Sequence, residues 1–271
     1  IPSSVKIIES HAFYGCSSLN KVVFESPSSL KSIGEFVFKG CSSLHEITIP
    51  DNFEAIESNL LDGCSSLEKV TIPSSVKSIK SYAFHGCSSL VQITIPPTVT
   101  SIEKYAFNEC TSLLEITIPS SLTSIESDTF CDCSSLEKVT FESPSSLSTI
   151  KLFAFKGCTS LPEITIPSSV TSIESNAFSK CSIKNIEFHD DSQLVLIDNN
   201  AFYSSHLESI CIPSNVVHIG QRAFKECNEL ETVEFQHNSK LKIIDEDAFI
   251  NTHLINLSIP SSVTVLKEGC F

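Results

Sequence analysis

The residues best suited to chemistry are twelve cysteines, eight histidines and a surplus of carboxylates in a chain of 271 residues. Eighteen Lys and Arg against 32 Asp and Glu give a formal net charge of −14. Nucleic-acid phosphates require clustered basic residues, so this balance predicts no nucleic-acid partner. The Gly-x-Gly-x-x-Gly, Walker and Gly-x-Ser-x-Gly motifs are absent. We therefore expect no enzyme activity and no cofactor.

Nine of the cysteines recur at one position of a repeating pattern. They are Cys16, Cys41, Cys64, Cys87, Cys110, Cys133, Cys158, Cys181 and Cys227. A column of small buried thiols is the favoured interpretation, because free Cys is among the most buried residue types. Disulfides between neighbouring repeats are geometrically conceivable, although nine cysteines cannot all pair within one column. Zinc is disfavoured, because Cys-x-x-Cys is absent and equivalent positions form a line, whereas zinc needs a tetrahedron.

The other candidate residues are scattered through the pattern. Cys211 falls at an outward strand position and is either a reactive surface thiol or a substitute for Thr, whereas Cys270 is expected in the core. Asp190-Asp191 is expected at a solvated loop corner in preference to a metal site. The histidines fall at different repeat positions, so no stacked pair and no metal site is predicted. Asn256-Leu257-Ser258 is a sequon, which makes Asn256 a candidate glycosylation site if the chain is secreted.

A repeat spans the whole chain and positions these residues. Its hydrophobic landmark recurs every 22–25 residues, within the range of leucine-rich repeats. The twelve landmarks are Phe13, Phe38, Leu61, Phe84, Phe107, Phe130, Phe155, Phe178, Phe202, Phe224, Phe249 and Phe271. The regular spacing predicts a single domain over residues 1–271 that is cut inside a repeat at both ends. Uncapped repeats expose apolar edges, here at Ile1 and Phe271, so self-association through these ends is expected.

Each repeat predicts a short strand followed by a turn. In the segment Leu67–Phe84, the apolar–polar alternation of Val70-Thr71-Ile72 indicates a strand with one face buried. Pro73 ends this strand, because proline has no N–H to donate to a ladder. Ser81 is expected to cap a short helical turn that carries Phe84 into the interior.

The predicted fold is a leucine-rich repeat solenoid of the mainly-β or α/β class. One repeat cannot bury its own Leu, Val, Ile and Phe side chains, so successive coils stack and share a core. We expect a right-handed superhelix with a parallel β-sheet on one face and short helical turns or irregular coil on the convex side. The 25-residue repeats carry two extra residues just after the strand, as in Phe24–Pro27 and Phe141–Pro144.

Two columns of side chains point outward from the predicted sheet, at the middle strand position and two residues earlier. In the central repeats these residues, here called the binding face, are Lys69, Thr71, Gln92, Thr94, Glu115, Thr117, Lys138, Thr140, Glu163 and Thr165. Threonine β-propensity and charge neutralisation between strands explain both columns without a function. A flat, weakly charged, concave face also suits a protein or glycan ligand.

A third column falls on the opposite side of the coils and is mostly acidic. It comprises Glu9, Glu57, Lys80, Glu103, Glu126, Lys151, Glu174, Asp198 and Asp245. We interpret this acidic column as a contribution to solubility. Calcium binding there lacks a loop motif to support it.

The repeat resembles the BspA-type leucine-rich repeats. The run Ile-Pro-Ser-Ser-Val-Thr-Ser-Ile-Glu-x-x-Ala-Phe-x-x-Cys-Ser-Ser-Leu carries the resemblance over the entire chain, and its best copies start at Ile72, Ile118 and Ile166. The resemblance implies a surface or secreted protein of an anaerobic bacterium or parasitic protist that adheres to host cells or extracellular matrix. It implies no catalytic residues.

Three functional classes follow from these patterns. The favoured one is a cell-surface or secreted scaffold with a protein or glycan ligand, such as host extracellular matrix. The alternative is an intracellular protein-interaction scaffold whose reduced thiols belong to the core. An enzyme or an ice-binding surface is the least supported. No run of residues is long and apolar enough to span a membrane.

Overall fold

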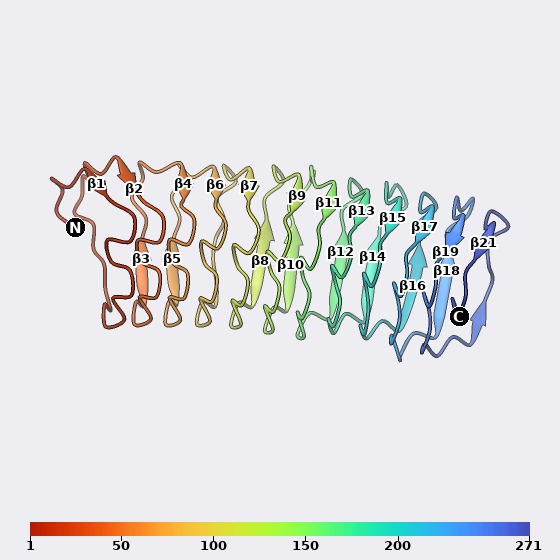
Figure 1. Ribbon diagram of the computed structural model, residues 1–271. Coiled ribbons are helices and arrows are strands. Elements are labelled where there is room, and N and C mark those ends of the chain that lie inside the picture. The colour runs from red at the N-terminus through yellow and green to blue at the C-terminus, as the bar shows by residue number, and fades with distance from the viewer. The chain divides into compact units, whose positions relative to one another are not determined.

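The computed structural model describes all 271 residues, and Figure 1 shows them as short β-strands joined by turns. The structure has 21 strands, the paired strands are parallel, and no residue is helical. The chain divides into two compact units, Ile1–Leu122 with Asp128–Ser143 and Thr123–Ser127 with Pro144–Phe271. The expectation of one domain over residues 1–271 stays a prediction.

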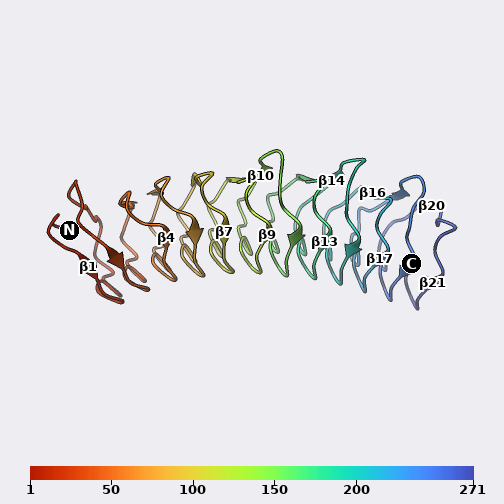
Figure 2. The same cartoon turned by 90° about the horizontal axis from the view of Figure 1, so that it is seen from above.

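In the first unit, the strands form two separate ladders, which Figure 2 shows from above. The ladder predicted from the sequence holds β3 (Glu46–Thr48), β5 (Lys69–Thr71), β8 (Glu115–Ile118) and β10 (Lys138–Phe141). The second ladder holds β1 (Ile7–Ile8), β2 (Ser32–Ile33), β4 (Ala55–Ile56), β6 (Ser78–Ile79) and β7 (Ser101–Ile102). The strands pair as β3–β5, β8–β10, β1–β2 and β4–β6–β7.

The second unit repeats this arrangement. Its predicted ladder holds β12 (Glu163–Ile166), β14 (Asn185–Phe188), β16 (Ser209–Ile212), β18 (Thr232–Phe235) and β20 (Asn256–Leu257). Its other ladder is a seven-stranded sheet of β9 (Ser124–Ile125), β11 (Thr149–Ile150), β13 (Ser172–Ile173), β15 (Leu196–Ile197), β17 (His218–Ile219), β19 (Ile243–Ile244) and β21 (Val265–Leu266). Each strand lies beside the strand one repeat away, so the predicted parallel stacking is confirmed within each unit.

The alternation predicted for the first ladder is confirmed. In β5, Val70 is buried between the exposed Lys69 and Thr71. Strand β8 ends at Ile118 and Pro119 follows at once, as expected where the ladder needs an N–H that proline lacks. The sequence therefore placed both the strand and its end.

The helical turn expected after Ser81 is wrong. The N–H groups of Phe84 and Gly86 donate to the carbonyl oxygens of Ala106 and Asn108 in the next coil. Only alternate residues, such as Ala83, bond within the turn, to the carbonyl three residues back. In an α-helix each N–H donates to the carbonyl four residues earlier. Here half of the N–H groups of the turn donate to the next coil instead, so no helix forms. Ser81 also caps no helix, since its hydroxyl donates to Glu103.

The landmark phenylalanines form the core of each unit. In the first unit Phe84, Phe107 and Phe130 stack with ring centroids 5.2 and 5.5 Å apart. The second unit stacks Phe155, Phe178, Phe202, Phe224, Phe249 and Phe271 at 4.9–5.4 Å. The rings in the interior of each stack are fully buried, whereas Phe271 at the chain end is 46% exposed. Because each ring touches the ring of the next repeat, the hydrophobic core belongs to pairs of repeats and not to single ones.

Candidate functional site

The first unit carries eight of the ten residues of the binding face, and all eight are exposed. The strand register places Lys69 opposite Glu46 and Thr71 opposite Thr48. It also places Lys138 opposite Glu115 and Thr140 opposite Thr117. Opposite charges therefore face each other across neighbouring strands, and threonines face threonines.

Two of these eight residues lie outside regular strands. Gln92 forms a single bridge with Glu115, and its amide donates to that carboxylate at 3.4 Å. Thr94 follows in a segment without ladder pairing and remains exposed. The outward columns thus continue through this coil although its ladder is interrupted.

The second unit carries Glu163 and Thr165 in β12, and both are exposed. Glu163 lies opposite Asn185, and Thr165 lies opposite Glu187. The Thr165 hydroxyl donates to the Glu187 carboxylate at 3.1 Å. The outward residues of this unit are therefore more acidic than those around Thr117.

The cysteine column joins successive coils through its thiols. Cys110 Sγ donates to the carbonyl oxygen of Phe84, the landmark of the preceding repeat, at 3.2 Å. The same contact to the preceding landmark is made at 2.9–3.3 Å by Cys41, Cys64, Cys87, Cys133, Cys181 and Cys227. Burial raises the pKa of Cys41 to about 11, which keeps the thiol protonated and therefore unreactive. Cys16 is the exception, because it is exposed.

Cys110→Ala is expected to lower the free energy of unfolding by about 1–2 kcal/mol, because it removes a buried hydrogen bond and leaves a small cavity. Cys110→Ser keeps a donor of similar size and should cost less. Urea unfolding followed by circular dichroism measures both changes. Cys16→Ala is the matched control, because this column member is exposed, and a loss there as large as for Cys110 would contradict the role of the buried contact.

The remaining candidates are placed as follows. Cys270 is buried, as predicted. Cys211 is exposed in β16, but partial burial and the charges of Glu234 and Asp190 raise its pKa, so the structure disfavours a reactive thiolate there. Asp190 is exposed at its corner, and no group of three or more His, Cys, Asp or Glu is placed to hold a metal ion. Asn256 is exposed in β20, and its glycosylation stays a prediction.

A charged triad that the sequence motifs did not reveal lies in the first unit. Asp62 is only 6% exposed and lies between Lys39, with Nζ at 2.7 Å, and His85, with Nδ1 at 2.9 Å. Burial opposes the charge of Asp62, but the hydrogen bonds from His85 and Lys39 outweigh it and lower the carboxyl pKa. The hydrogen bond to Asp62 raises the pKa of His85. Lys39, Asp62 and His85 each directly follow a landmark residue. Opposite charges at this one repeat position are the sequence signal that indicates the triad.

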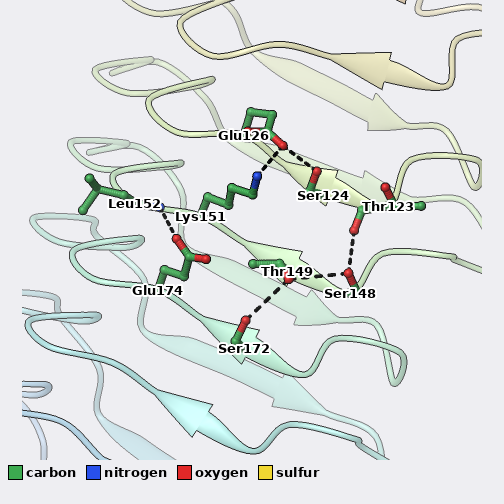
Figure 3. Close-up of polar contacts among 9 residues, drawn as sticks. All are labelled: Thr123, Ser124, Glu126, Ser148, Thr149, Lys151, Leu152, Ser172 and Glu174. Atoms are coloured by element: carbon green, nitrogen blue, oxygen red, sulfur yellow. Dashed lines mark hydrogen bonds and ion pairs between the residues drawn. The ribbon is translucent and has the colours of Figure 1, made fainter.

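Carboxylates of the acidic column also accept hydrogen bonds from residues of the neighbouring coil. Figure 3 shows this in the second unit, where the Glu126 carboxylate accepts from Ser124 and from Lys151, both at 2.7 Å. Glu174 accepts the backbone N–H of Leu152 at 3.2 Å. In the first unit, Glu103 accepts the N–H and the hydroxyl of Ser81. These carboxylates satisfy donors that the turn leaves unpaired.

One family model matches the chain at residues 1–96, 77–198 and 148–271. The model describes a BspA-type leucine-rich repeat region of six copies. The three matches together extend from the first residue to the last, and they confirm the resemblance that the repeat carries. Among curated proteins, none matches the chain.

The chain is similar to several solved leucine-rich repeat structures. A leucine-rich repeat protein from Bacteroides ovatus is 26% identical with a TM-score of 0.70, over 98% of this chain and 80% of its own. A leucine-rich cell surface protein from Faecalibacterium prausnitzii is 28% identical with a TM-score of 0.63, and the match covers 98% of this chain and 79% of the relative. The pneumococcal vaccine antigen PcpA is 23% identical with a TM-score of 0.58, and the match covers 83% of this chain and 68% of the antigen. The predicted leucine-rich repeat solenoid is thereby confirmed, without its helical turns.

Proposed function

Because the chain belongs to the BspA-type leucine-rich repeat family, we propose that it is a non-enzymatic binding scaffold of the cell surface. Its ligand is a protein or glycan of a host cell or extracellular matrix. The observation that carries this proposal is the part of the binding face in the first unit, where eight outward side chains are all exposed.

The chemistry of this face supports a protein or glycan ligand over a charged polymer. Strand register sets Glu115 opposite Lys138 and Thr117 opposite Thr140, so charges are offset by their neighbours and hydroxyls lie between them. Such a surface binds through many weak hydrogen bonds and van der Waals contacts spread over several repeats. The chain carries a net charge of −14, which repels nucleic acid.

Similarity supports the proposed location. The Faecalibacterium prausnitzii relative is named as a cell surface protein. The structure contains no helix with the length and apolar character that a membrane crossing needs. Protease digestion of intact cells that make the native product tests the location: loss of the protein supports the surface, and full protection supports an intracellular scaffold instead.

The triple variant Thr94→Lys, Thr117→Lys and Thr140→Lys is expected to weaken ligand binding about ten-fold or more, because three unpaired charges must be desolvated in the interface. The measurement is saturation binding to immobilised extracellular matrix proteins, with circular dichroism to show that the fold is retained.

The matched control for this variant carries the same three charges at a repeat position outside the binding face. Thr100→Lys, Thr123→Lys and Thr171→Lys change exposed threonines at a repeat position where Lys77 and Lys242 already occur. This control is expected to bind like the wild type. Equal loss in both variants, or unchanged binding in the first, would remove the binding face from the proposal.

A further inference from the structure

A pocket of about 660 Å³ opens in the first unit, between residues 21–28 and residues 46–52. It lies where the predicted ladder is interrupted. Lys21 forms one bridge with Glu46, and no paired residues follow it. One coil further along, Glu46–Thr48 pairs with Lys69–Thr71 over three residues.

The backbone on the walls of this pocket keeps unpaired donors and acceptors. Val23 and Glu25 bond on their other side, to the amine and the carbonyl of Ile1. Successive residues of a strand direct their backbone groups to opposite neighbours, so Val22 and Phe24 direct theirs toward the coil of Glu46 and Thr48, where the Lys21–Glu46 bridge already engages the Val22 N–H. No backbone hydrogen bond joins residues 22–28 to residues 47–52. Beyond that bridge, the backbone groups of Phe24 and Thr48 therefore face each other without a backbone partner.

The pocket is lined by apolar side chains, among them Val22, Val23 and Phe24, and by three carboxylates. Val23 is 56% exposed although it is apolar. The carboxylates of Glu25, Glu46 and Asp51 line the pocket against the single amine of Lys21. The Lys21–Glu46 pair, at 3.2 Å, is more than half exposed on both sides, so it holds these groups only weakly.

We propose that this pocket binds an extended peptide segment that carries a lysine or arginine side chain. The peptide backbone bonds to the free groups of Phe24 and Thr48, as in the addition of a strand to a sheet edge. An apolar peptide side chain covers Val23. The basic side chain pairs with Asp51 and Glu46, whose charges complement it.

This inference rests on the proposed function, because Val23 and Thr48 belong to the same outward column as the binding face. It adds the chemical class of the partner, a basic extended peptide, and the place on the first unit where that peptide binds. It also requires neither Thr94 nor Thr117, which lie outside the pocket. The two proposals can therefore fail separately.

The test uses fluorescence anisotropy with a labelled octapeptide, Gly-Ser-Val-Lys-Val-Arg-Ser-Gly, and the full chain. We expect saturable binding that falls about ten-fold or more for Val23→Arg and for Asp51→Lys, since each places a like charge beside the peptide. The peptide with glutamate in place of lysine and arginine should not bind. N-methylation of its central amides should also weaken binding, because it removes backbone donors.

Thr100→Arg is the matched control, since it adds the same charge at an exposed position outside the pocket and the binding face. Its affinity for the octapeptide should equal that of the wild type. Val23 is largely exposed, so Val23→Arg is expected to keep the melting temperature of the wild type.

Absence of saturable octapeptide binding, or binding that Val23→Arg leaves intact, overturns the inference. Loss of binding in Thr140→Arg without loss in Val23→Arg also overturns it, because the peptide would then lie elsewhere on the binding face. If the matrix-protein assay still depends on Thr94, Thr117 and Thr140, the proposed function stands and only the pocket assignment falls.

Discussion

Phe107→Ala is expected to lower the free energy of unfolding by about 3–5 kcal/mol, the usual cost of removing a buried aromatic ring. Phe107 is fully buried and lies between two other rings, with centroids at 5.2 Å to Phe84 and 5.5 Å to Phe130. The ring planes differ by only 8° and 6°. One substitution therefore leaves a cavity that touches the cores of two neighbouring repeats.

Urea unfolding measures this loss, and two further variants calibrate it. Phe107→Leu is expected to cost about 1 kcal/mol, because Leu61 occupies the same repeat position and is fully buried. Tyr105→Ala removes a ring that also stacks, at 4.6 Å on Tyr82, but at a partly exposed position. It should cost less than half as much as Phe107→Ala. Equal losses for Tyr105 and Phe107 would show that the landmark column is not the shared core.

Asp62→Asn is expected to lower the free energy of unfolding by about 2–3 kcal/mol near pH 6. Removing one partner of a buried ion pair leaves the other charge uncompensated. Here Lys39 and His85 are about one-third exposed, so water offsets part of that cost. Asp190→Asn, which neutralises an exposed carboxylate at a loop corner, serves as the control and should have little effect.

The same triad makes stability depend on pH in a defined direction. The pKa of His85 is raised from its ordinary 6.5, so its contribution is complete below pH 6.5 and is lost as the pH rises through the raised value. The pKa of Asp62 is lowered from 3.8, so its contribution is complete above pH 3.8 and is lost as the pH falls through the lowered value. The triad therefore stabilises the fold most between these two ordinary values.

Unfolding measured across this pH range checks that direction, and NMR titration of His85 checks its cause. In Asp62→Asn the pKa of His85 should fall, because burial then acts without the carboxylate. A stability profile that is the same in the wild type and in Asp62→Asn would contradict the assignment of this pH dependence to the triad.

The sequence by itself determined the features that recur at a fixed period. The spacing of the landmarks predicted that Phe107 and its equivalents are buried, and alternation predicted that Thr117 and Lys138 point outward. Proline after the strand predicted where a ladder such as β8 ends. These features depend on side-chain size and on the missing proline N–H, both of which are local properties that every copy of the repeat expresses.

Only the tertiary structure decided which groups bond between coils. The two-residue strands such as β6 often recur as a Ser-Ile or Thr-Ile pair at a fixed repeat position, but with one inward side chain they are too short for alternation to distinguish a strand from a turn. The N–H of Phe84 donates to the carbonyl of Ala106 in the next coil, a partner that the packing of that coil supplies. The pocket beside Thr48 arises in the same way, and the contact of Asp62 with His85, although both residues lie at one repeat position, is made by the same stacking. Each depends on atoms brought together from residues more than twenty positions apart, where the spacing between stacked coils decides the partner.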